Sequence, residues 1–242
     1  MRISFFFLLL AFTVSGFGQD TVNITDSRGH RQGFWRKNDS SGHVIYEGHF
    51  RDGVPSGVFR YFYPDGKLKT LSTLSNQGKR AVTVSYFPNG TKMAEGNYLD
   101  EKKDSTWQFF SEYSGALVSR ETYLSGQIHG FSKVFYEEGG LSEQQEYKNG
   151  AKDGPWEQHY PDGKPKLLGT YKDGKLNGLL KTLYKSGQIM YTGIYVDGYK
   201  DKTWLYYNEK GAVTKKEIYR GGKLIKVDPE VKEPLPVVPE GQ

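Results

Sequence analysis

The chain contains no cysteine among its 242 residues. No disulfide can form and no lipid can be attached to a thiol, so noncovalent packing alone must hold the fold together. Long apolar runs are almost as scarce, since the one clear run extends from Phe5 to Phe12. This run is shorter than the roughly 20 residues that span a bilayer. We therefore expect no transmembrane segment in the mature chain.

The apolar run has the three-part organisation of a secretory signal peptide. Arg2 supplies a positive charge before it, and the small residues Gly16 and Gly18 precede Gln19. Small residues at the −3 and −1 positions favour cleavage, which predicts a signal peptide over residues 1–18. The alternative is an uncleaved N-terminal anchor, which the shortness of the run disfavours. The protein is therefore predicted to be exported, to the periplasm, the cell surface or the medium.

Sequence motifs for catalysis and for metal binding are also missing. The five histidines form no pair at the spacing of metal ligands, and the chain has no HExxH, GxSxG or Walker motif. The aspartates of its many Asp-Gly pairs are predicted to cap turn backbone rather than to bind calcium. The sequence therefore predicts no enzyme, no cofactor and no metal site. Carboxylates such as Glu157 and Asp162 could still converge in the fold.

A 24-residue repeat is what the chain does contain. The residues at one repeat position are Trp35, Phe59, Thr83 and Trp107 and, after one inserted residue, Ser132, Trp156, Leu180 and Trp204. We call this the marker position and number the copies one to eight. Such self-similarity is typical of repeat architectures, in which each copy packs on its neighbours.

Each copy is predicted to form one β-hairpin. In copy six, strand formers around Trp156 are followed by the turn residues 161–163 (PDG), and a second run ends at Tyr171 before Asp173-Gly174. We predict an all-β fold, an elongated antiparallel β-meander of about eight 24-residue hairpin repeats over residues 31–226. Its structural residues are Trp107, Trp156, Trp204, Tyr171, Tyr195, Gly163, Gly174, Gly187 and Gly198.

The segments outside the repeats differ in composition. Residues 19–30 are interpreted as an N-terminal linker, and the Pro-rich residues 227–242 as a disordered tail. Charge is also uneven, because residues 151–226 carry 15 Lys and Arg but 8 Asp and Glu. An excess of seven positive charges could attract an acidic protein, an anionic lipid or a polyanion. The alternative is a solvated, lysine-rich sheet that resists edge-to-edge aggregation.

The repeat resembles a known family. Residues 147–156 (YKNGAKDGPW) and 171–178 (YKDGKLNG) place an aromatic residue and two glycines as MORN repeats do. The 24-residue period around residues 160–164 (YPDGK) is similar to the MORN-variant repeat of bacterial proteins labelled as YwqK-family toxin–antitoxin antitoxins. The resemblance covers about residues 31–224. It implies an elongated, often curved sheet and a non-enzymatic role in contacts with proteins or membrane phospholipids.

Tyrosines and lysines of the regular C-terminal copies are the candidate partner-binding residues. Tyrosine beside basic residues is a common interface composition, although repeat packing alone could also explain the tyrosines. The candidates are Tyr160, Tyr184, Tyr206, Tyr207, Lys181, Lys185 and Lys200. We expect an exported scaffold that binds an unknown protein, with an immunity-like or antitoxin-like role. The alternative is an envelope-surface binder of anionic lipid or glycan through the basic C-terminal half, and export makes nucleic acid an unlikely partner.

Overall fold

The computed structural model describes residues 22–229, and these form one antiparallel sheet of 19 strands. The predicted signal peptide and residues 230–242 of the predicted tail lie outside the described residues. The strands are β1 (Ile24–Thr25), β2 (Arg31–Asn38), β3 (Val44–Arg51), β4 (Val54–Phe62), β5 (Leu68–Ser75), β6 (Arg80–Tyr86), β7 (Lys92–Leu99), β8 (Lys102–Phe110), β9 (Leu117–Leu124), β10 (Gln127–Phe135), β11 (Leu141–Lys148), β12 (Ala151–His159), β13 (Pro165–Lys172), β14 (Lys175–Leu176), β15 (Gly178–Leu183), β16 (Ile189–Val196), β17 (Tyr199–Tyr207), β18 (Val213–Arg220) and β19 (Lys223–Pro229).

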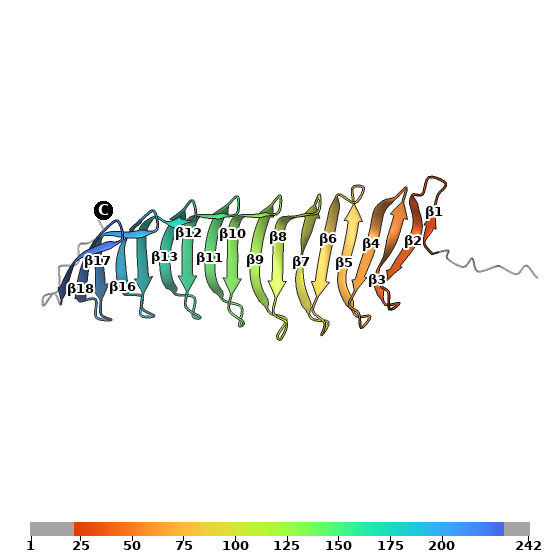
Figure 1. Ribbon diagram of the computed structural model, residues 1–242. Helices are drawn as coiled ribbons and strands as arrows, with labels where there is room; N and C mark the ends of the chain where they lie inside the picture. The colour runs from red at the N-terminus through yellow and green to blue at the C-terminus, as the bar shows by residue number, and fades with distance from the viewer. Residues whose placement is uncertain (1–21, 230–242) are drawn as a thin grey trace, which may run out of the picture.

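The strands form a meander, so that their order in space follows their order in the sequence. Trp156 of β12, for example, lies opposite Gln145 of β11 and Gly169 of β13. The result is a long ribbon whose strands cross its axis, with β1 and β18 near opposite ends and turns along both long edges (Figure 1). The predicted all-β meander is confirmed. Between residues 22 and 229 no helix has the length and apolarity needed to cross a membrane.

Eight hairpins follow one another at the predicted repeat spacing. Seven are formed by two continuous strands, from β2–β3 to β17–β18, and in copy seven β14 and β15 share one strand position on either side of Asn177. The boundaries of the array differ slightly from the prediction. β1 lies within the expected linker and pairs with β2, and β19 continues through residues 227–229 of the expected tail. Pairing to the end strands of the array orders these flanking residues.

The turns follow from the turn residues of the sequence. Asp173 and Gly174 have φ values of 48° and 80°, the left-handed pair that a type I′ hairpin turn requires. The amide of Gly174 donates to the carbonyl oxygen of Lys152 at 2.8 Å, which ties this turn to the beginning of the same copy. In the first turn the Asp162 carboxylate accepts a hydrogen bond from the Lys164 amide at 3.3 Å. The first-turn aspartates Asp65 and Asp162 cap turn backbone, as predicted.

The markers form the core of the sheet. They lie on one face, which we call the core face, and Trp204 is fully buried there. The rings of Tyr195 and Tyr219 meet the Trp204 ring edge-on, with centroids 5.1 and 6.5 Å away. Such aromatic pairs stabilise a thin array because each ring covers a large area against its neighbours. The opposite face, the second face, carries the residues adjacent to the markers, such as Leu179 and Lys181, because side chains alternate along a strand.

A second row of glycines, which the turn pattern did not predict, lies in the strands rather than in the turns. These glycines stand 13 positions after a marker, and a Cβ at each would lie less than 3.0 Å from the next marker side chain. They are Gly48, Gly96, Gly169 and Gly193. The fixed spacing was the signal that could have identified them. Without a side chain at these positions, the marker ring of the next copy packs directly on the strand backbone.

Candidate functional site

The structure distributes the predicted partner-binding residues over three locations. Lys200 and Tyr206 lie on the core face, where the Lys200 ammonium is 4.2 Å from the centroid of the Trp204 ring. Lys181 and Tyr207 lie on the second face, because each follows a core-face residue directly in its strand. The remaining candidates, Tyr160, Tyr184 and Lys185, occupy the first turns. The residues therefore do not form one surface.

Glu217 organises the core-face cluster at the C-terminal end. Its carboxylate accepts hydrogen bonds from the hydroxyls of Tyr206 at 2.5 Å and Tyr219 at 3.0 Å. The ammonium of Lys215 lies 2.8 Å from the same carboxylate, and that of Lys200 lies 3.9 Å away. Burial raises the pKa of Glu217, but these hydrogen bonds and charges outweigh it and lower the pKa to about 2. Burial and the bond to Glu217 raise the pKa of Tyr206.

Copy four contains a similar cluster. The Lys103 ammonium lies 4.7 Å from the centroid of the Trp107 ring and 4.9 Å from that of Tyr123, whose hydroxyl donates to Glu121. Burial lowers the pKa of Lys103, although the charge of Glu121 opposes this effect. A basic residue four positions before the marker covers every tryptophan of the array, and these residues are Arg31, Lys103, Lys152 and Lys200. Because the arrangement recurs with the repeat, it is a packing motif of the array.

The first-turn tyrosines form a ladder between copies. The hydroxyl of Tyr160 donates to the carbonyl oxygen of Leu183 at 2.7 Å, and that of Tyr184 donates to that of Tyr207 at 2.8 Å. Tyr63 and Tyr136 make the same bond to the carbonyl 23 residues further on. These hydroxyls therefore connect copy two to copy three and join copies five to eight in series. The sequence pattern showed the tyrosines but not the acceptor of each hydroxyl.

One buried position departs from the repeat pattern. Gln145 stands where copies one, three, six and seven have the strand glycine, and its Nε2 donates to the carbonyl oxygen of Glu146 at 2.8 Å. The equivalent carbonyls of copies three and seven, those of Asn97 and Ile194, accept the indole N–H of the next marker, Trp107 or Trp204. Among the described residues, the buried indole nitrogen of Trp156 consequently has no hydrogen-bond partner. The glutamine has taken the acceptor that the tryptophan uses elsewhere.

A shallow hollow on the second face contains one of the predicted residues. Lys181 lines it together with Leu168, Thr170 and Leu179, and its volume is about 220 Å³. Leu179 is 51% exposed and Leu168 36% exposed, so apolar surface lies open to solvent beside a cation. Aliphatic side chains at this level of exposure next to a basic residue resemble the surface of a protein-binding patch. We call these four residues the leucine patch.

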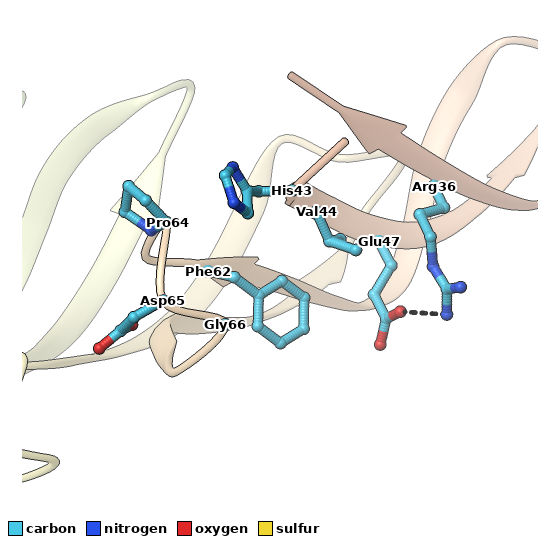
Figure 2. Close-up of a pocket in the computed structure, with 8 residues that line it drawn as sticks. All are labelled: Arg36, His43, Val44, Glu47, Phe62, Pro64, Asp65 and Gly66. Atoms are coloured by element: carbon cyan, nitrogen blue, oxygen red, sulfur yellow. Dashed lines mark hydrogen bonds and ion pairs between the residues drawn. The ribbon is translucent and has the colours of Figure 1, made fainter. Parts of the chain in front are cut away.

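A larger hollow lies near the N-terminal end of the array (Figure 2). The hollow has a volume of about 640 Å³. The ion pair of Arg36 and Glu47, at 3.1 Å, lies on one side of Phe62, and His43 and Asp65 lie on the other. Glu47 also lies 3.8 Å from Arg60, and His43 faces Asp39 at 3.1 Å. Glu47 thus faces two arginines, and the Asp65 carboxylate lies 3.1 Å from the Lys67 ammonium. Within residues 22–229 no group of three or more His, Asp or Glu side chains converges as metal ligands would.

The fold and its surfaces define an open β-meander repeat protein. Residues 55–76, 128–149 and 152–173 match the MORN repeat variant. Each matched segment begins four residues before a marker. The three segments therefore coincide with the hairpins of copies two, five and six. Three segments of the chain are thus similar to the MORN repeat variant. The finer resemblance to the YwqK-family antitoxins stays a prediction.

The other comparisons add little. No curated protein matches the chain. A crystal structure of TarM is 17% identical with a TM-score of 0.29, over 39% of this chain and 20% of that one. A structure of an S. aureus TarM mutant in complex with fondaparinux, alpha-GlcNAc-glycerol and UDP is 13% identical with a TM-score of 0.31, over 50% of this chain and 21% of that one. Likenesses this weak carry no inference about this protein.

Proposed function

We propose that the protein is an exported, non-enzymatic scaffold that binds a protein partner through the leucine patch of its second face. The observation that carries the proposal is the exposure of Leu168 and Leu179 beside Lys181. On the core face of copies six to eight Leu167, Leu180 and Trp204 are buried against one another, whereas Leu168 and Leu179 are open to solvent. Burying such a patch against a partner removes apolar area from water, at about 25 cal/mol per Å².

The charges of the array support a protein partner over an anionic surface. Lys200 and Lys215 face Glu217, and Lys152 lies over the rings of Trp156 and Tyr171. Part of the positive charge of the C-terminal half is thus used inside the sheet. A lipid or polyanion would be attracted by the remaining charge only, and salt would screen that attraction strongly. MORN repeats as a class take part in contacts with proteins or membranes, which fits both partners.

An immunity-like role would follow from export combined with tight binding of one protein. The predicted signal peptide places such a partner outside the cytoplasm. The scaffold would act by covering a surface of a toxin or effector there, with no chemistry of its own. The paired charges of the N-terminal hollow and of the Glu217 cluster fit a structural role for the carboxylates.

The proposal is tested by affinity capture with paired variants. The tagged protein is produced in its source organism, and bound proteins are identified at low and high salt. L168S/L179S removes the apolar part of the leucine patch. V82S is the matched control, because Val82 stands at the same repeat position as Leu179 and is 61% exposed, but lies in β6. The purified partner is then titrated against all three proteins.

We expect one protein to survive high salt with the wild type and V82S, and to bind L168S/L179S at least about tenfold more weakly. Equal binding to all three would place the interface elsewhere and contradict the leucine patch. Recovery of anionic lipid or glycan that is lost at high salt, with no protein, would favour envelope-surface binding instead. Export is checked separately by the N-terminal sequence of the purified protein, which is expected to begin at Gln19.

A further inference from the structure

The core face is not filled evenly along the array. In copies two and three, four core-face positions carry small hydroxyl residues where several other copies carry glycine or a large side chain. They are Thr70, Ser72, Thr83 and Ser85. Thr83 stands at the marker position, where tryptophan occurs four times, and Ser85 at the position of Phe109 and Tyr206. The ribbon therefore loses its aromatic filling over β5 and β6.

This loss leaves a hollow of about 430 Å³ on the core face. Phe59 and Tyr61 bound it on the side of β4, and Tyr98 bounds it on the side of β7. It continues into a second hollow of about 340 Å³, because the two share lining residues around Pro55 and Lys79. Their sizes fall in the range of roughly 300–1,000 Å³ that is usual for ligand sites.

The floor of the hollow offers neutral hydrogen-bonding groups in a regular arrangement. Ser72 and Thr83 pair through their hydroxyl oxygens at 2.9 Å, and Thr70 and Ser85 do so at 3.3 Å. Each pair uses one of its two hydroxyl hydrogens, so one donor and several acceptor lone pairs are left in each. Thr70 and Ser85 are half-buried, whereas Ser72 and Thr83 are buried beneath them. The cross-strand pairs Thr70–Ser85 and Ser72–Thr83 are two residues apart along each strand, so both point to the same face.

We propose that this hollow, the hydroxyl groove, binds a neutral oligosaccharide. A sugar ring has apolar C–H faces that suit the rings of Tyr61 and Tyr98, and hydroxyl edges that suit a floor of donors and acceptors. The two charged side chains at the rim, Lys79 and Glu101, have opposite signs. An anionic ligand would gain little from such a rim, and an apolar chain would leave the floor hydroxyls without partners. The proposal is independent of a partner at the leucine patch.

The groove can be closed by a substitution that introduces a residue already present at the equivalent position of other copies. Thr70→Tyr is such a substitution, because Tyr46 and Tyr191 stand at the same repeat position as Thr70. Ser119→Tyr makes the same change at the equivalent position of copy four, outside the groove, and is the matched control. Tyr61→Ala removes a wall of the groove instead of filling it. Circular dichroism and the unfolding midpoint show whether each variant is folded.

The test is calorimetric titration with maltohexaose, cellohexaose and hexa-N-acetylchitohexaose. The protein is expressed as the full chain, and the producing cell removes any signal peptide. We expect saturable binding of at least one of these, at least about tenfold weaker in T70Y and in Y61A, and unchanged in S119Y. We expect the affinity to be the same at about 0.05 and about 0.5 M NaCl, unlike binding by the basic half. Absence of saturable binding to all three sugars would overturn the proposal. Binding that both T70Y and Y61A retain would also overturn it, because the ligand would then lie elsewhere.

Discussion

Gly193 and Trp204 lie on neighbouring strands, and the ring of Trp204 fills the space that a side chain of residue 193 would need. Gly96 and Trp107 stand in the same relation in copy four. The two residues come from successive copies, so this contact joins the copies. A hairpin alone is marginally stable, and the packing of a marker on the preceding glycine is one way in which stability accumulates along the array.

Replacing this glycine should destabilise the protein. In Gly193→Ala the new Cβ would overlap the Trp204 ring, which must shift or strain its neighbours. We expect the free energy of unfolding, measured in urea, to fall by about 2 kcal/mol. Gly140→Ala is the control, because a Cβ there would have no atom nearer than 3.7 Å. Equal effects of the two substitutions would show that the ring contact is not the cause.

The Glu217 cluster should make the free energy of unfolding depend on pH in the acidic range. The pKa of Glu217 is about 2 in the folded protein, against an ordinary value of 4.5. A carboxylate with a lowered pKa stabilises the fold fully above pH 4.5, and this contribution is lost as the pH falls toward 2. Glu217→Gln should therefore lower the free energy of unfolding at pH 7 by about 2 kcal/mol and at pH 2 by far less.

Urea unfolding at pH 7, 4.5, 3 and 2 measures this dependence. The control is Glu209→Gln, since Glu209 is exposed in the turn between β17 and β18. A difference between wild type and Glu217→Gln that stays constant over the whole pH range would contradict the assignment. The difference would then come from the shape of the side chain and not from its charge.

The tyrosine ladder should contribute measurably at each rung. Tyr184→Phe removes the hydroxyl that donates to the Tyr207 carbonyl and leaves the ring in place. We expect a loss of about 1 kcal/mol in the free energy of unfolding, the usual contribution of a hydrogen bond. Tyr199→Phe, at a ring that is 61% exposed, should change it by less than about 0.5 kcal/mol. If Tyr184→Phe weakened partner binding without changing stability, the hydroxyl would act in recognition instead.

Restoring the repeat pattern where copy two meets copy three should stabilise the array and close the hydroxyl groove. S72G/T83W introduces the glycine and tryptophan that copies three and four place at Gly96 and Trp107. Burying the new ring should raise the free energy of unfolding by about 1 kcal/mol, after the lost hydroxyl pair and the cost of glycine are included. T83W alone should be less stable than the double variant, because the Ser72 side chain occupies the space of the ring. Additive effects in a double-mutant cycle would contradict this packing.

The local pattern determined most of the architecture. The spacing of Trp156 and Leu180 predicted the hairpin array, and residue pairs such as Asp173-Gly174 predicted the turns, because both depend on the geometry of a few consecutive residues. Chain composition could not show which tyrosines were free to bind a partner. Tyr184 and Tyr206 have similar sequence surroundings, but one donates to backbone and the other to a buried carboxylate.

The way in which the copies meet depends on contacts that form only in the folded array. The surroundings of several residues depend on a neighbour 11 or more positions away in the sequence. Examples are the strand glycine Gly193, the exposed Leu179 and the hydroxyl pair of Ser72 and Thr83. A repeat sequence specifies each hairpin through its own turns and alternation. The faces, hollows and buried charges arise when one copy packs on the next, because a side chain's environment is then set by residues one strand away. The regular 24-residue period thus determined the scaffold. The residues that depart from it determined where hollows and exposed apolar side chains lie.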